Sequence, residues 1–128
     1  MGEKLISSQK WHGPIIFIGF GSIGKGTLPL VLRHIECDPQ QIIIIDPSDL
    51  NKHVADSYGV RFLQKKLTRE NYVEILKPFI ASDMGQALIL NASVNVSSKD
   101  IIELALQTNS LYVDTTIDPW DGEYFNKN

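Results

Sequence analysis

The fold is decided by residues 15–24, where the apolar run Ile-Ile-Phe-Ile is followed by the loop Gly-Phe-Gly-Ser-Ile-Gly. An apolar run that ends in glycine is typical of a strand buried on both faces, and residues 22–36 predict a helix directly after it. The loop matches the pattern G-x-G-x-x-G, which is informative only where it joins a strand to a helix. Because that context is present, we predict a dinucleotide-binding loop. The alternative is a tight strand–helix turn that holds no ligand.

Each residue type in this loop has a physical reason to be there. Gly19 permits the tight turn, Gly21 lets a pyrophosphate approach the backbone, and Gly24 allows close packing of helix on strand. The amides of Ser22 and Ile23 lie at the helix N-terminus, where free N–H groups and the helix dipole favour an anion. The loop therefore predicts contacts to the pyrophosphate of a dinucleotide.

Asp46 is the expected acidic partner of the loop. It follows the apolar run of residues 42–45, about 20 residues after Gly24, as the fingerprint requires. A carboxylate there accepts hydrogen bonds from the adenosine ribose and repels a 2′-phosphate, and Lys52 is the only cation among residues 47–52. We therefore expect NAD rather than NADP. The alternative is that Asp46 caps the next helix, and both roles can coexist.

The rest of the chain continues to alternate between strands and helices. The apolar pattern predicts strands at residues 60–63, 87–90 and 111–113, and helices over residues 49–57, from Thr68 onward, and from Ser97 to near Asn109. This alternation predicts an α/β fold, a doubly wound parallel sheet of the Rossmann type. Asn91 and Ala92 then end a strand where the nicotinamide ribose is expected, although Asn91 could equally begin an ordinary turn.

Composition places the chain among single globular domains and excludes several functions. It has 128 residues, 43% hydrophobic and 21% charged, with a net charge of −3, so no basic nucleic-acid surface is indicated. The longest aliphatic runs are far shorter than the ~20 residues of a membrane helix, and no secretory signal is visible. The lone Cys37 fits a reducing cytoplasm.

The sequence shows no catalytic machinery. It has no Ser-His-Asp spacing, no pair of metal ligands and no G-x-x-x-x-G-K-[ST] loop, so we predict no catalytic residue and no metal site. The three histidines are expected at the surface. Pro29 is unusual, because it removes a helical amide and predicts a kink or local opening near the start of its helix.

Five segments together resemble the N-terminal part of bacterial homospermidine synthases, in the saccharopine dehydrogenase-like group. They read GPIIFIGFGSIGKGTLPL at residues 13–30, IIIIDP at 42–47, GVRFLQKKLTRENY at 59–72, LNASVNVSSKDIIELA at 90–105 and LYVDTTIDPW at 111–120. The resemblance extends from about Gly13 to Trp120, and Pro29 lies within it.

The resemblance implies a larger enzyme than this chain. Residues 1–128 would be one NAD-binding domain, an N-terminal fragment that is inactive alone, and the rest would hold most of the substrate pocket and the contacts of a homodimer. Such enzymes convert two molecules of putrescine into homospermidine and ammonia, using NAD for oxidation to an imine and for the final reduction. By position, the cofactor contacts would be Gly19, Gly21, Ser22, Ile23 and Gly24 at the pyrophosphate, Asp46 at the ribose, and Thr68, Asn91 and Ala92 elsewhere.

A cationic diamine needs carboxylates, and these follow the last predicted strand. We predict Asp118 as an ammonium contact, Asp114 as a second and Trp120 as an aromatic wall. The alternative is a solvated turn, since the Asp-Pro-Trp-Asp-Gly stretch has turn composition.

Two other functions remain open. A saccharopine or carboxynorspermidine dehydrogenase domain would bind substrates with carboxylates and should offer a guanidinium, whereas the strand ends here offer acids. A non-catalytic NAD-sensing module would need its own dimer surface.

Overall fold

A computed structural model describes residues 9–81, 83–114 and 120. Its main sheet has five parallel strands in the order β5-β4-β2-β6-β7. The strands are β2 (Ile15–Ile18), β4 (Ile42–Asp46), β5 (Arg61–Gln64), β6 (Leu88–Asn91) and β7 (Leu111–Asp114). The helices are α2 (Ser22–His34), α3 (Lys52–Tyr58), α4 (Tyr72–Ile80) and α5 (Ser98–Gln107).

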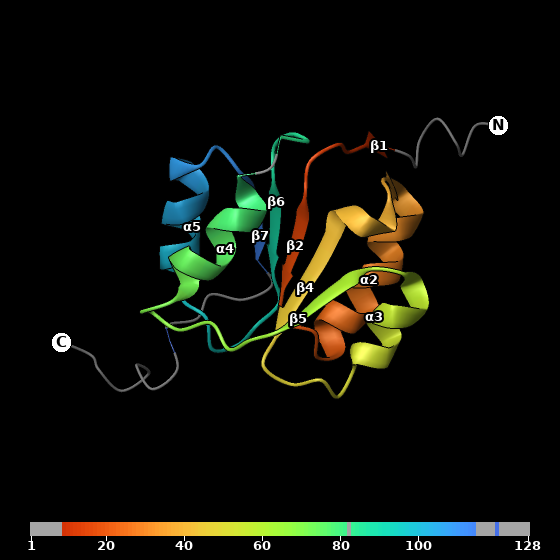
Figure 1. Ribbon diagram of the computed structural model, residues 1–128, viewed down its shortest axis with the longest axis horizontal. Helices are drawn as coiled ribbons and strands as arrows, with labels where there is room; N and C mark the ends of the chain where they lie inside the picture. The colour runs from red at the N-terminus through yellow and green to blue at the C-terminus, as the bar shows by residue number, and fades with distance from the viewer. Residues whose placement is uncertain (1–8, 82, 115–119, 121–128) are drawn as a thin grey trace.

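The helices cover the two faces of the sheet in pairs, with α2 and α3 on one face and α4 and α5 on the other (Figure 1). Within this sheet, the chain first forms the central strand β2, then β4 and β5 on one side of it, and then β6 and β7 on the other side. This confirms the predicted doubly wound α/β fold. Its order reverses between β2 and β6, which is where such sheets bind their ligands.

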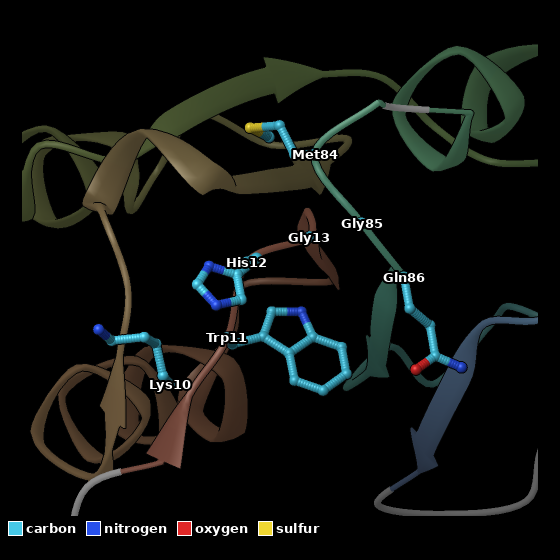
Figure 2. A pocket seen from close by; sticks show the side chains of 7 residues that line it. All are labelled: Lys10, Trp11, His12, Gly13, Met84, Gly85 and Gln86. Atoms are coloured by element: carbon cyan, nitrogen blue, oxygen red, sulfur yellow. The ribbon is translucent and has the colours of Figure 1, made fainter.

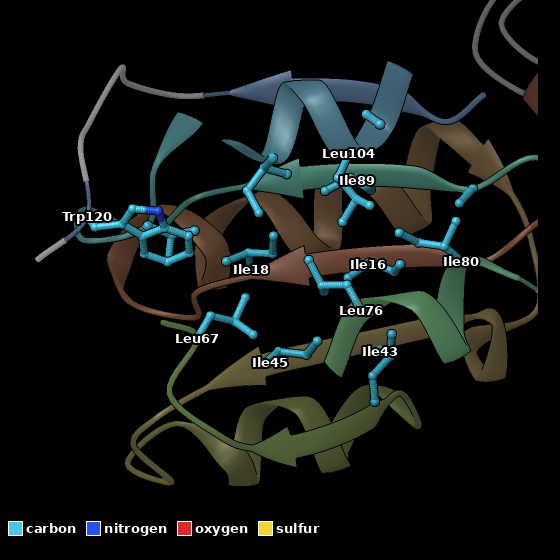
Figure 3. Close-up of a cluster of buried hydrophobic side chains, with 14 residues drawn as sticks. Ile16, Ile18, Ile43, Ile45, Leu67, Leu76, Ile80, Ile89, Leu104 and Trp120 are labelled. Atoms are coloured by element: carbon cyan, nitrogen blue, oxygen red, sulfur yellow. The ribbon is translucent and has the colours of Figure 1, made fainter. Parts of the chain in front are cut away.

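Burial explains why the central strands are continuously apolar. All four residues of β2 are at most 1% exposed, because their side chains alternate between two hydrophobic clusters. Ile16 and Ile18 pack beneath α4 and α5 in the cluster of Figure 3, while Ile15 and Phe17 pack on the opposite face. Each strand residue thus faces a packed layer, as expected for a parallel sheet covered on both sides.

Helix starts differ from the predicted ones where side chains organise the preceding loop. α3 begins at Lys52 rather than at residue 49, because the segment after β4 first forms a turn in which the Ser48 amide donates to Asp46 Oδ1. α4 begins at Tyr72 rather than near Thr68, whose N–H instead donates to Asn71 Oδ1. The start of α5 is as predicted, with Ser97 Oγ accepting from the Asp100 amide.

Two further differences concern α2. It ends at His34, and the chain then forms the two-residue strand β3 (Ile35–Glu36), which pairs with β1 (Gln9–Lys10) in a separate small sheet; the short 3-10 helix η1 (Pro39–Gln41) follows. The predicted opening at Pro29 is absent, since α2 is one unbroken helix through this residue.

Candidate functional site

A cavity of about 410 Å³ opens at the carboxyl ends of β2, β4 and β6. It combines the glycine loop, the end of β4 and the loop that follows β6. The residues that line it are Gly19, Phe20, Gly21, Ser22, Ile23, Asp46, Pro47, Ala92, Ser93, Val94 and Asn95. The topology therefore brings three segments distant in sequence to one edge of the sheet.

The glycines of the loop meet different constraints. Gly19 has a φ of +94°, and a Cβ on it would lie 2.9 Å from the Ser93 amide nitrogen. A Cβ on Gly24 would lie 2.6 Å from the Gly19 carbonyl oxygen. Both positions therefore require glycine for the fold itself.

Gly21 is different, because the space where its side chain would lie is open. An added Cβ would meet no described atom within 4 Å. This space opens into the cavity that Gly21 lines. The missing side chain leaves room for a ligand to approach the backbone closely.

The start of α2 presents backbone donors to the same cavity. Within the described residues, no side chain caps this helix, and its first backbone bond is from the Lys25 amide to the Gly21 carbonyl, at 2.9 Å. Ser22 and Ile23 line the cavity at this end. Uncapped amides together with the helix dipole form a binding place for an anion.

Asp46 faces the glycine loop from the end of β4. Its Oδ2 accepts from the Phe20 amide at 2.6 Å, and its Oδ1 accepts from the Ser48 amide at 2.8 Å. The alternative that Asp46 caps the next helix is wrong, because α3 begins only after Asn51. A carboxylate has about four acceptor positions, so Asp46 retains acceptor capacity for ribose hydroxyls.

Asn51 belongs to this arrangement although the sequence analysis did not select it. Its Nδ2 donates to the Phe20 carbonyl at 2.9 Å, and its Oδ1 accepts from Lys25 Nζ at 3.4 Å. The nearby cation Lys52 is bound elsewhere, with its Nζ 3.0 Å from Asp56 Oδ2. Lys52 therefore forms its ion pair within α3, with Asp56.

The opposite rim of the cavity is held by a chain of side chains. Asn91 is fully buried; its Oδ1 accepts from the Ser93 amide at 3.1 Å and its Nδ2 donates to the Tyr112 hydroxyl at 3.0 Å. That hydroxyl donates to Asp114 Oδ2 at 2.5 Å. Burial, and then the hydrogen bond to Asp114, raises the pKa of Tyr112 to about 12.

The cavity contains most, but not all, of the predicted cofactor residues. Six line it: Gly19, Gly21, Ser22, Ile23, Asp46 and Ala92. Gly24 packs against the loop, Asn91 is buried beneath the rim, and Thr68 is outside the lining. The lining residues that the analysis missed are Phe20, Pro47, Ser93, Val94 and Asn95, which directly follow predicted ones in sequence.

The predicted substrate residues have separate positions. Trp120 does not form a wall of the cavity: it is 4% exposed, packs in the cluster of Figure 3, and its Nε1 donates to Asp100 Oδ2 at 2.6 Å. Tyr72 lies beside it, with ring centroids 5.3 Å apart. Asp114 ends β7 and accepts from Tyr112. Asp118 lies outside the described residues, and its role stays a prediction.

The described part of the chain offers little chemistry of its own. His12, His34 and His53 are exposed, as predicted. Burial, and then the charge of Asp38, raises the pKa of Cys37. Among the described residues, no group of three or more histidines, cysteines or acids is placed to hold a metal, and no helix is both long and apolar enough to cross a membrane.

A second cavity, of about 400 Å³, lies at the opposite edge of the sheet (Figure 2). It is lined by residues before β2, including Trp11 and His12, and by Met84 and Gly85 before β6. Since these segments precede the strands, this cavity is separate from the one at the carboxyl ends.

Comparisons with known proteins agree with this geometry. A family model described as the saccharopine dehydrogenase NADP binding domain matches residues 15–127. Homospermidine synthase of Blastochloris viridis is 50% identical over 113 residues, which cover 88% of this chain and 24% of that protein. Homospermidine synthase of Mesorhizobium japonicum is 41% identical over 113 residues, covering 88% of this chain and 23% of that protein.

A solved structure shares the fold. The crystal structure of homospermidine synthase from Legionella pneumophila in complex with NAD matches with a TM-score of 0.85 at 26% identity, covering 94% of this chain and 26% of that one. The chain thus spans about a quarter of the length of these relatives. The resemblance stated from the sequence motifs is confirmed.

Proposed function

Because this chain belongs to the saccharopine dehydrogenase NADP-binding-domain family, we propose that its cavity at the carboxyl ends of β2, β4 and β6 binds NAD. The observation that carries the proposal is the open space above Gly21, beside the uncapped start of α2 and the carboxylate of Asp46. The pyrophosphate would lie over Gly21 and the amides of Ser22 and Ile23. Asp46 would accept from the adenosine ribose.

Other cofactor residues keep distinct roles in this proposal. Gly19 and Gly24 shape the loop, and Ala92 borders the nicotinamide half of the cavity. Asn91 acts from beneath through the loop that it holds. Thr68 remains a proposed contact beyond the cavity lining. The solved relative in complex with NAD supports NAD as the dinucleotide.

Thermal unfolding of the chain with NAD and with NADP tests this proposal. A ligand at 100 times its dissociation constant adds ~2.7 kcal/mol to the free energy of unfolding, so NAD should raise the melting temperature visibly. NADP should raise it less, because Asp46 repels a 2′-phosphate. Equal shifts would remove the assignment of Asp46, and no shift with either nucleotide would contradict the proposed site.

We further propose that this domain, residues 1–128, serves a longer cytoplasmic homodimeric enzyme that forms homospermidine and ammonia from two molecules of putrescine. The support is the 50% and 41% identity to homospermidine synthases that are about four times as long. Bound NAD would supply the hydride acceptor and donor. This chain's own residues would bind and orient it, and turnover by the 128-residue chain alone would contradict the proposal.

Asp118 is the proposed substrate contact in this chain. In the longer enzyme, Asp118→Asn removes the charge while nearly keeping the shape of the side chain. A charged hydrogen bond contributes ~1.5–3 kcal/mol, so the putrescine KM should rise at least ~10-fold while NAD affinity stays unchanged. An unchanged KM would leave Asp118 as a turn residue.

A further inference from the structure

The backbone of Phe20 is held from both sides by two side chains of one segment. Its N–H donates to Asp46 Oδ2 at 2.6 Å, and its carbonyl accepts from Asn51 Nδ2 at 2.9 Å. The Phe20 ring is 2% exposed and packs in the core on the α2 and α3 face. The residue between the two glycines of the loop is therefore fixed through its amide, its carbonyl and its side chain.

The hold on the carbonyl determines where the next amide points. A trans peptide is planar, and its C=O and N–H point in opposite directions; the described chain contains no cis peptide. Because the Phe20 carbonyl is directed at Asn51, the N–H of Gly21 is directed away from Asn51. Gly21 lines the cavity and Asn51 does not.

Two contacts agree on the orientation of the Asn51 amide. Its nitrogen faces a carbonyl oxygen, and its oxygen faces the ammonium of Lys25 at 3.4 Å. A flipped amide would oppose oxygen to oxygen and nitrogen to nitrogen. Both contacts therefore require that Asn51 Nδ2, and not its oxygen, faces the Phe20 carbonyl.

Building on the proposed NAD site, we propose that Asn51 is a positioning residue for the dinucleotide. It fixes the peptide between Phe20 and Gly21 so that the Gly21 N–H stays available to the pyrophosphate. Asp46 acts at the ribose and recognises which nucleotide is bound, whereas Asn51 sets the shape of the loop that all pyrophosphate-bearing nucleotides share.

Gln86 offers a control. Like Asn51, it donates from its side-chain amide to a backbone carbonyl distant in sequence, that of Asn109 at 2.8 Å. It lies before β6, at the amino end of the sheet, and does not line the cavity at the carboxyl ends of the strands. Gln86→Ala thus removes a comparable contact at a distance from the proposed site.

The experiment measures NAD and NADP affinity and urea unfolding of the full chain for wild type, Asn51→Ala, Asn51→Asp and Gln86→Ala. Asn51→Ala should weaken NAD binding about 10-fold and NADP binding by the same factor, so the preference between them is unchanged, while Gln86→Ala keeps wild-type affinity. Asn51→Asp keeps the shape and the Lys25 contact but loses the donor to the Phe20 carbonyl. It should also bind NAD more weakly, while its added negative charge at the helix start offsets part of the lost stability.

The outcomes separate this proposal from the one on which it rests. Wild-type affinity in both Asn51 variants would overturn the positioning role and leave the NAD site intact. Equal losses in Asn51→Ala and Gln86→Ala would reduce Asn51 to a general effect on stability and would also overturn the positioning role. Absence of NAD binding by the wild-type chain would overturn both proposals.

Discussion

The two rims of the cavity are held in different ways. At the β4 rim, Asp46 and Asn51 hold the Phe20 backbone directly. At the β6 rim, the loop is held through buried Asn91, which depends in turn on Tyr112 and, through its hydroxyl, on the neighbouring strand β7. At the first rim, side chains from the end of β4 and the start of α3 bind the backbone of the glycine loop, whereas at the second rim side chains of β6 and β7 bind one another.

This difference suggests separate roles for the two rims. A loop fixed by direct contacts presents donors in one geometry, which suits the invariant pyrophosphate and ribose of a dinucleotide. The loop after β6 is held through hydrogen bonds among Asn91, Tyr112 and Asp114, so a change in any of these side chains would alter its position. Since Asp114 at the end of β7 accepts from Tyr112, changes at the predicted substrate edge would reach the loop after β6.

Gly21→Val should break the β4 rim most severely. Its side chain would occupy the space of the pyrophosphate, whose charged hydrogen bonds contribute ~1.5–3 kcal/mol each, so NAD affinity should fall roughly 100-fold or more. The added side chain should not displace neighbouring atoms, because a Cβ at Gly21 would meet none within 4 Å, and urea unfolding checks that the variant is folded. Titration calorimetry measures the loss, and Gly26→Val, at another open position, should retain NAD. Retained affinity in folded Gly21→Val would refute the loop assignment.

The contrast between the rims also explains what the sequence could predict. The strands could be predicted because continuous apolar runs, such as residues 15–18 and 42–45, are typical of strands buried on both faces. The glycine loop and Asp46 were readable because a fixed spacing within one β-α-β unit places them together. Local rules were sufficient for the fold, for the glycine loop and for Asp46.

The rest depended on contacts distant in sequence. Asn91 meets Tyr112 across 21 residues and Phe20 meets Asn51 across 31, and no local pattern indicates either pair. Trp120 was predicted as an aromatic wall for a diamine, but it is 4% exposed and its indole N–H donates to Asp100, 20 residues away in sequence. Asp118 lies outside the described residues, so its placement is untested.

Asp46→Asn should have the next largest effect, on selectivity. The amide oxygen can still accept from the Phe20 N–H, whereas the bond from the Ser48 amide is lost and the charge that repels a 2′-phosphate is gone. Charged hydrogen bonds exceed neutral ones by about 1 kcal/mol or more, so the preference for NAD over NADP should fall about 10-fold. Fluorescence titration with both nucleotides measures it. Asp49→Asn, with the same charge change at an exposed neighbour, should leave the preference intact; an equal change there would indicate net charge instead.

Tyr112→Phe should loosen the β6 rim. It removes the bond from Asn91 Nδ2 and the bond to Asp114 Oδ2, and a hydrogen bond to a charged group contributes ~1.5–3 kcal/mol. Urea unfolding should show this loss, whereas Tyr58→Phe, at 38% exposure, should behave as wild type. NAD should bind severalfold more weakly, while ADP, which lacks the nicotinamide half, should bind as before. Equal weakening of both ligands would mean that the two rims are not independent.

The smallest expected effect is a pH dependence at the same hydroxyl. The folded chain raises the pKa of Tyr112 from its ordinary value of 10.0 to about 12, chiefly by burial and then by the bond to Asp114. Between these values the folded state keeps a proton that the unfolded state has lost. The stabilisation is therefore fully present below pH 10 and is lost as pH rises through about 12. Across this interval, the free energy of unfolding in urea should fall more steeply with pH for wild type than for Tyr112→Phe. Tyr58→Phe should follow wild type. Parallel profiles for wild type and Tyr112→Phe would show that the hydroxyl does not hold the β6 rim through its proton.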